Sequence, residues 1–423
     1  MSEISCNGDK NNNTAKRKYL GYRGEWYDVT NFVERHPGGD IIEKFVGQDA
    51  THVIDTAHSK DVLKSWKPVS LGRKDAPEPY QYDPTSFEKQ MLALHVKLKK
   101  NGFYDDSVGW FIRKFIIVAS LNVVIFILLF NYSNIFYIQC LCSFLLAAFW
   151  QQSGMLMHDL MHSQAFQNRK IDEIFGVFFG TFCFGISSRW WKDEHIVHHA
   201  LTNTVDYASG FIDPQAHEDV WAQNEKLFPF MCEKIHHFFI KIQYWTFLPF
   251  CILIGRFGIL VDSYRLERRK DVWLAFALHL IWISAMINLL PGWKSRILFY
   301  YFASVGEGIL HIQLLMNHYS KPFFEKEDMH ETGFFRAMVD CNINIVCPVW
   351  MDWFHGGLNF HIEHHCFPRM PRNRLREVSP MIKKICAESG ILYDECSFTS
   401  ALTRTMSHLK SVSKLFTAMK DYN

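Results

Sequence analysis

The sequence Ile112-Arg-Lys-Phe-Ile-Ile-Val-Ala-Ser-Leu-Asn-Val-Val-Ile-Phe-Ile-Leu-Leu-Phe130 is an apolar run close to the length needed to cross the hydrocarbon core of a membrane. A second apolar run covers residues 135–152, and only Asn131-Tyr-Ser-Asn134 separates the two. So short a connection predicts an antiparallel helical hairpin. Two further runs, at 272–290 and 297–316, are joined through Pro291-Gly-Trp-Lys-Ser295 and predict a second hairpin.

Histidines gather in three clusters around these runs: His158-Asp-Leu-Met-His162, His195-Ile-Val-His-His199 and His361-Ile-Glu-His-His365. Residues three or four apart are neighbours on a helix, so each cluster can direct two or three imidazoles at one site. With 21 histidines in 423 residues, the pattern H-x-x-H-H is expected by chance only about 0.05 times. It occurs twice, which favours a shared metal site over unrelated core or surface histidines.

The three clusters can build one site only if they lie on the same side of the membrane. The second and third clusters must then be separated by an even number of spans. The run at 174–187 is too short to span, and the run at 238–259 carries Lys241, Gln243 and Arg256, so both are interpreted as interfacial. Four spans result, with both termini and all clusters in the cytosol, and most basic residues beside the spans agree with the positive-inside tendency. Lys294 and Arg296 are exceptions, because this topology places them on the side opposite the cytosol.

The N-terminal part carries a second set of motifs, namely Tyr27-Asp-Val-Thr-Asn-Phe32, His36-Pro-Gly-Gly-Asp40, Gly47-Gln-Asp-Ala-Thr51 and Ala57-His58-Ser59. Glycines after a histidine allow a planar group to approach the backbone closely. The segment resembles cytochrome b5 over residues 19–75. The resemblance implies a haem b with His36 and His58 as its axial ligands. His52 competes for the second position, but the Ala-His-Ser context favours His58.

The remaining motifs are the order of the histidine clusters, Trp190-Trp-Lys-Asp-Glu-His195, Asp352-Trp-Phe-His-Gly-Gly-Leu-Asn-Phe360 and Phe367-Pro-Arg-Met-Pro371. With the haem motifs, they resemble the membrane fatty acid desaturases of the front-end type, which carry a fused cytochrome b5 domain. Within the family the chain looks closest to the insect cytochrome b5-related branch. The implied architecture is a small α+β haem domain at 19–75, a linker at 76–109 and, at 110–423, an all-α integral membrane domain with about four transmembrane helices and a cytosolic histidine-rich cap.

Imidazole suits zinc, copper, iron and nickel alike, so the histidines alone do not name the metal. The resemblance implies two non-haem iron ions that use molecular oxygen as co-substrate, with no catalytic side chain beyond the metal ligands. The implied ligands are His158, His162, His195, His198, His199, His318, His361, His364 and His365. Front-end enzymes usually have glutamine where this chain has His361, and this departure weakens any transfer of their double-bond position.

The family also implies a lipid or acyl-CoA substrate, NADH-cytochrome b5 reductase as electron source, and the endoplasmic reticulum membrane as location. A formal net charge of +2 gives no reason to expect a nucleic acid partner. Three functions stay open: a fatty acyl desaturase, a fatty acyl or sphingoid hydroxylase of the same chemistry, and a membrane-anchored cytochrome b5 electron carrier without desaturase activity. Among residues near the clusters, Asp159, Glu363 and His355 are candidates to orient ligand histidines, whereas His236 and His237 are interpreted as surface residues.

Overall fold

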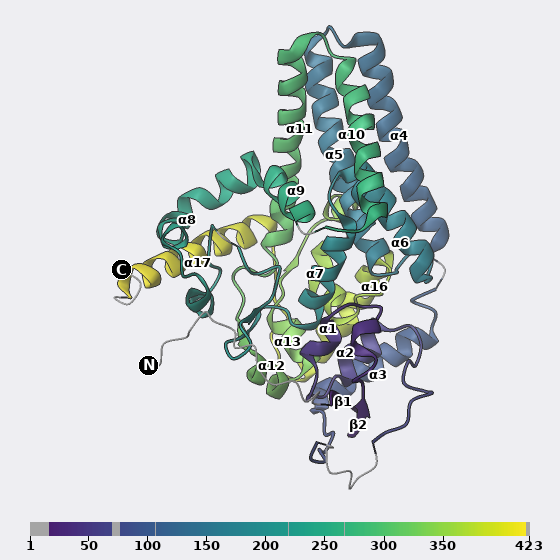
Figure 1. Ribbon diagram of the computed structural model, residues 1–423, viewed down its shortest axis with the longest axis vertical. Helices are drawn as coiled ribbons and strands as arrows, with labels where there is room; N and C mark the ends of the chain where they lie inside the picture. Colours follow the sequence, from purple (N-terminus) through teal and green to yellow (C-terminus); the bar gives the residue numbers. More distant parts are fainter. Residues whose placement is uncertain (1–16, 70–76, 106, 219, 266, 420–423) are drawn as a thin grey trace. The chain divides into compact units, whose positions relative to one another are not determined.

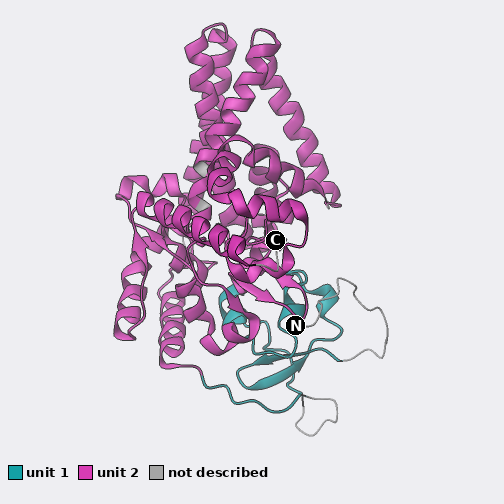
Figure 2. Ribbon diagram, turned by 90° about the vertical axis from the view of Figure 1, so that its left-hand side faces the viewer, with its two compact units in different colours: residues 1–83 teal, residues 84–423 magenta. Residues whose placement is uncertain are grey.

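The computed structural model describes residues 17–69, 77–105, 107–218, 220–265 and 267–419. The chain forms two compact units, residues 1–83 and 84–423, which are coloured separately in Figure 2. The N-terminus predicted to be cytosolic falls within residues 1–16, which lie outside the described residues. Residues 76–109, predicted as a linker, include a helix, α3 (Ser86–Lys100), that belongs to the second unit.

The first unit is small and mixes strands with short helices. Strands β1 (Tyr19–Tyr22) and β2 (Glu25–Asp28) pair antiparallel, with Leu20 opposite Tyr27. They are joined by a tight turn in which Gly24 has a φ of 84°, a backbone angle that glycine adopts without strain. Short helices follow at η1 (Val33–Arg35), α1 (Ile41–Lys44) and α2 (Thr51–Ala57).

Four long helices in two hairpins dominate the second unit. The first hairpin is α4 (Val108–Tyr132) and α5 (Phe136–Met161), and the second is α10 (Lys270–Asn288) and α11 (Gly292–Leu315). Helix α5 packs against both α4 and α11, and the turns of the two hairpins lie at the same end of the unit (Figure 1). The close approach of α5 and α11 depends on Gly306, where an added Cβ would lie 2.9 Å from that of Ala147.

The outer faces of these helices are apolar. Helix α4 buries one stripe, which includes Val118 and Ile125, while Ile116 and Phe130 are 61% and 75% exposed. Three described helices, α4, α5 and α10, are long and apolar enough to cross a membrane, and up to five spans result if each of two bent helix pairs is one span. Large apolar side chains that face outward along such helices match a lipid environment.

The two runs predicted to be interfacial form bent helix pairs. Helix α6 (Arg169–Val177) continues into a π-helical segment, η2 (Phe178–Phe184), and the chain then bends by 114° into α7 (Ser188–Ala200). Helix α8 (Lys234–Leu253) bends by 78° into α9 (Gly255–Arg265). The first bend carries the second histidine cluster back toward the end of α5.

The rest of the second unit covers the ends of the long helices. Its helices are η3 (Glu225–Phe230), α12 (Lys326–Thr332), α13 (Phe334–Asp340), η4 (Val349–Met351), α14 (Asp352–His355), η5 (Leu358–Phe360), α15 (His361–Cys366), α16 (Arg372–Glu388) and α17 (Phe398–Ala418). The prediction of an all-α domain is wrong in detail, because five short strands are present: β3 (Thr204–Asp206), β4 (Phe211–Ile212), β5 (Phe324–Glu325), β6 (Asn344–Ile345) and β7 (Glu395–Cys396). At two or three residues each, they are too short to show in a hydrophobic pattern.

Candidate metal centre

The three histidine clusters converge on one buried region of the second unit. The first cluster ends α5, the second lies on the last turns of α7, and the third forms α15. His318 follows the end of α11. All nine histidines that the resemblance implied as metal ligands are buried. They divide into two neighbouring groups.

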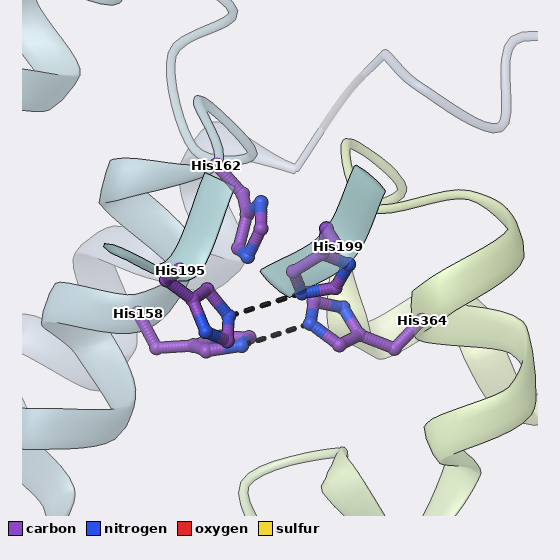
Figure 3. A group of neighbouring side chains, drawn as sticks. All are labelled: His158, His162, His195, His199 and His364. Atoms are coloured by element: carbon purple, nitrogen blue, oxygen red, sulfur yellow. Dashed lines mark hydrogen bonds between the residues drawn. The ribbon is translucent and has the colours of Figure 1, made fainter. Parts of the chain in front are cut away.

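The first group holds five imidazoles whose ligand atoms lie within 4.8 Å of one another: His158, His162, His195, His199 and His364. Figure 3 shows the five rings turned toward a common centre, contributed by α5, α7 and α15. The Nε2 atoms of His158 and His364 are 2.9 Å apart, and those of His195 and His199 are 3.0 Å apart. All three clusters therefore contribute to this group.

The second group consists of His198, His318 and His365, whose ligand atoms also lie within 4.8 Å of one another. His361 adjoins them, because its Nε2 atom is 2.8 Å from that of His318. The Nε2 atoms of His198 and His318 are 3.3 Å apart. The two groups share helices α7 and α15, so successive residues of one cluster serve different groups.

These spacings fit a pair of bound metal ions. Two nitrogens bonded to one ion at about 2.1 Å, at angles between a right angle and the tetrahedral angle, lie about 3.0–3.4 Å apart. The buried Nε2 atoms of His162 and His365 have no hydrogen-bond partner among the described residues, and one metal ion in each group would satisfy them. Nine imidazoles are too many for one tetrahedral zinc, whereas two ions of higher coordination number can use them.

Burial favours the neutral form, which metal binding requires, in several of these histidines. Burial, reinforced by the neighbouring histidines, lowers the pKa of His361, His364 and His365 well below its ordinary value. The same cause, with His361 as the nearest histidine, lowers the pKa of His318. A neutral imidazole keeps a lone pair on one nitrogen for a metal while the other nitrogen donates a proton.

Several rings form a hydrogen bond through Nδ1, on the side away from the group, and this bond leaves Nε2 as the nitrogen that can bind a metal. His198 Nδ1 donates to Asp213 Oδ2 at 2.8 Å, and His195 Nδ1 donates to Gln215 Oε1 at 2.8 Å. His318 Nδ1 donates to the Cys341 carbonyl at 3.1 Å. These bonds point Nε2 of each ring toward its group, as outer-shell partners do in metal sites.

The partners from the loop after α7 were not predicted from the sequence. Asp213 and Gln215 follow the second cluster by more than a dozen residues, and the short β3–β4 hairpin returns them to it. The hydroxyl of Thr202 is a further partner of the ligand histidines. It donates to the His198 carbonyl and lies 3.1 Å from His365 Nδ1. No sequence signal marks these residues, because an aspartate, a glutamine and a threonine in a loop are usually exposed.

Of the residues predicted to orient ligands, Asp159 lies 3.2 Å from His158 Nδ1 and forms an ion pair with Arg372 at 2.8 Å. Glu363 instead accepts hydrogen bonds from Tyr393 and Asn344, which brace α15 from behind. His355 is buried, contacts the ring of Phe398 and belongs to neither group.

The first unit brings the rings of His36 and His58 together, with ring centroids 6.3 Å apart and the ring planes tilted by 54°. The Nδ1 atom of each ring lies within hydrogen-bond distance of a backbone carbonyl oxygen, 3.1 Å for His36 and 3.0 Å for His58. An iron bonded to both rings at about 2 Å fits this separation. An added Cβ at Gly38 would lie 2.7 Å from the His36 ring. His52 lies elsewhere, with its Nε2 atom 3.3 Å from the Tyr82 hydroxyl.

Comparisons with known proteins agree with this geometry. The fatty acid desaturase family model matches residues 135–397, and the model for the cytochrome b5-like heme/steroid binding domain matches residues 9–96. An acyl-lipid (9-3)-desaturase of Borago officinalis is 28% identical, over 95% of this chain and 91% of its own length. A Delta(8)-fatty-acid desaturase of Helianthus annuus is 29% identical over 95% and 89%. The Delta(6)-fatty-acid desaturase fat-3 of Caenorhabditis elegans is 27% identical over 92% and 95%.

The two family models match both halves of the chain, and each of these relatives is covered over 89% or more of its own length. The resemblance seen in the motifs is therefore confirmed, as is the enzyme class, an oxidoreductase of the desaturase type. The cofactors that the two matched families imply are haem, a di-iron centre and molecular oxygen. This chain belongs to the fatty acid desaturase family and carries a cytochrome b5-like domain at its N-terminus.

Proposed function

We propose that this protein introduces a double bond into a fatty acyl chain, with electrons supplied through its own haem domain. The observation that carries the proposal is the convergence of nine buried histidines into two adjoining groups with metal-ligand spacing. A pair of irons bound there supplies the oxygen chemistry that breaks unactivated C–H bonds, which no side-chain acid or base can do. We assign His36 and His58 to the haem and the nine histidines to the irons.

The protein's own residues prepare the site for these ions. The imidazoles present Nε2 to the ions, while Asp213, Gln215, Thr202 and the Cys341 carbonyl contact the Nδ1 side of the rings. The burial of both groups excludes bulk water from the ligands. A preformed, dry ligand cage lowers the reorganisation needed when metal binds.

The membrane arrangement that we propose has α4, α5, α10 and α11 as four spans. The histidine groups lie at the end of the unit opposite the two hairpin turns, and the positive-inside tendency assigns that end to the cytosol. Both termini are then cytosolic. We propose the endoplasmic reticulum membrane as the location, NADH-cytochrome b5 reductase as the electron donor and a lipid-linked or coenzyme A-linked acyl chain as the substrate.

The test is expression of the full chain in a host with a defined fatty acid composition, followed by mass spectrometry of the lipids. A new product lacking two hydrogens identifies desaturation, and a product with one added oxygen identifies hydroxylation instead. His364→Ala should abolish the product and leave the haem spectrum unchanged. His330→Ala, at an exposed histidine of α12, is the matched control and should retain the product. Product formation by the His364→Ala protein would contradict the assigned site.

A further inference from the structure

A cluster of exposed apolar side chains lies just before the third histidine cluster. Val346 and Val349 are 59% and 67% exposed, and Trp350 and Trp353 are 70% and 50% exposed. We call residues 346–353 the tryptophan loop. Its single charged side chain, Asp352, forms an ion pair with Arg376 at 2.6 Å. Contiguous exposed aromatic and aliphatic side chains of this kind mark a surface that a partner covers.

Hydrogen bonds fix the position of the end of this loop along the axes of α5 and α11. The Trp353 carbonyl accepts from Gln152 Nε2 at 2.9 Å, and the Phe354 carbonyl accepts from Gln151 Nε2 at 2.5 Å and Gln313 Nε2 at 3.2 Å. Gln151 and Gln152 belong to α5, and Gln313 belongs to α11. The loop is therefore attached to the sides of two helices that we assign as spans.

The distance from the hairpin turns then places the loop relative to the bilayer. At about 1.5 Å per residue, Gln151 lies about 22 Å from the start of α5 at Phe136. Gln313 lies about 31 Å from the start of α11 at Gly292 by the same rise. In the four-span arrangement both helices begin at the far face of the hydrocarbon core, which is about 30 Å thick. These values therefore put Trp353 and Phe354 between the cytosolic boundary of the core and a depth of about 8 Å below it.

We propose that the tryptophan loop inserts into the cytosolic leaflet and binds the boundary between lipid headgroups and acyl chains. Tryptophan is enriched at this depth, where the ring is buried among acyl chains and its N–H meets the headgroups. The attachment to α5 and α11 makes the loop continuous with the membrane-facing surface, and this favours a lipid partner over a protein one. The proposal rests on the four-span arrangement stated above.

The insertion has a consequence for the metal centre. From Phe354 the chain runs through η5, where the Leu358 carbonyl accepts from Asn317 Nδ2 at 3.1 Å, and enters α15 at His361. Asn317 immediately precedes His318. A loop seated in the leaflet thus holds the third histidine cluster against the membrane surface, on the side from which a bilayer lipid arrives.

The test uses the full protein in vesicles of phosphatidylcholine and phosphatidylserine, with its exposed native cysteines replaced by serine. A nitroxide label is placed at Val349→Cys, and its collisions with dissolved oxygen and with a water-soluble nickel complex are compared. Ile281→Cys, at a 66% exposed position of α10, is the membrane reference. Lys384→Cys, with a side chain 75% exposed on α16, is the aqueous reference.

The expected result is a label at 349 that lies between the two references, with more frequent oxygen collisions and fewer nickel collisions than the label at 384. A label that resembles the aqueous reference would overturn the insertion and leave the spans intact. A label shielded from both reagents would indicate that protein, from this chain or from a second copy of it, covers the loop, and would equally overturn the insertion. If the label at 281 is itself accessible to nickel, the four-span arrangement fails, and the insertion that rests on it fails with it.

Discussion

Asp213 provides the sharpest test of how the protein holds its metal ions. Its Oδ2 atom accepts from His198 Nδ1 and from the Asn203 backbone N–H, both at 2.8 Å, and its Oδ1 atom accepts from the Gln215 N–H at 3.0 Å. The carboxylate is completely buried. Asp213→Asn keeps the shape but removes the charge, and it replaces one acceptor oxygen by an NH₂ group that must face an N–H donor.

The size of the effect follows from these contacts. A hydrogen bond to a charged group is worth about 1.5–3 kcal/mol, and loss of an outer-shell partner typically lowers metal affinity about 10–100-fold. We therefore expect Asp213→Asn to lower the affinity for one of the two irons, the one held by the group of His198, by about 10–100-fold. The other iron, held by the group of His158, should be bound with a smaller loss of affinity, because Asp213 reaches this group only through Gln215 and His195.

The assay is a titration of apoprotein with Fe(II) under anaerobic conditions, read by a chelator competition that resolves two affinities. The haem spectrum reports that the first unit is intact. Asp328→Asn, at an aspartate of α12 with a side chain 61% exposed, is the matched control and should bind both ions normally. Two unchanged affinities in the Asp213→Asn protein would refute the role of this carboxylate, and so would an equal loss at both sites.

Three further predictions concern other parts of the chain. His36→Ala should remove the haem absorbance while two non-haem irons per chain remain, and loss of both metals together would contradict independent sites. Burial raises the pKa of Glu88 to about 7. Between about pH 4.5 and about pH 7 the folded chain therefore retains a proton that the unfolded chain releases. Because the folded chain binds more protons over this range, the thermal stability should fall as the pH rises from about 4.5 to about 7. Glu88→Gln should flatten this dependence of the melting temperature, and an unchanged slope would contradict it. Gly308→Ala puts a Cβ 2.5 Å from the Cys251 carbonyl oxygen and should destabilise the protein by about 1–3 kcal/mol in thermal unfolding, whereas Gly109→Ala, with open space around its Cβ, should not.

The sequence was informative wherever function needs several residues of one type at a fixed spacing. Histidines three and four residues apart share a helix face, so the three clusters predicted a common site, and the structure brings them together. Long apolar runs predicted the helices of the two hairpins for a similar reason, because their composition is constrained over many consecutive positions. The haem motifs combine both kinds of information, since glycine and histidine occur in a fixed order.

The features that the sequence did not predict depend on contacts between distant segments. Asp213 and Gln215 reach the second cluster only because β3 and β4 fold back on each other. Glu363 lies inside the third cluster, yet it turns away from the metal ligands toward Tyr393, which is thirty residues further along. Polar residues of this kind carry no pattern of their own, and only the tertiary structure decides which partner they meet.

Metal content is the measurement that bears on the whole proposal. The full chain is purified in detergent, reconstituted with haem and Fe(II) without oxygen, and analysed for haem by its pyridine haemochrome and for total iron by elemental analysis. Two irons in the histidine groups and one in the haem domain predict about three irons per haem. A ratio of one iron per haem after reconstitution would contradict the di-iron centre and leave the chain an electron carrier.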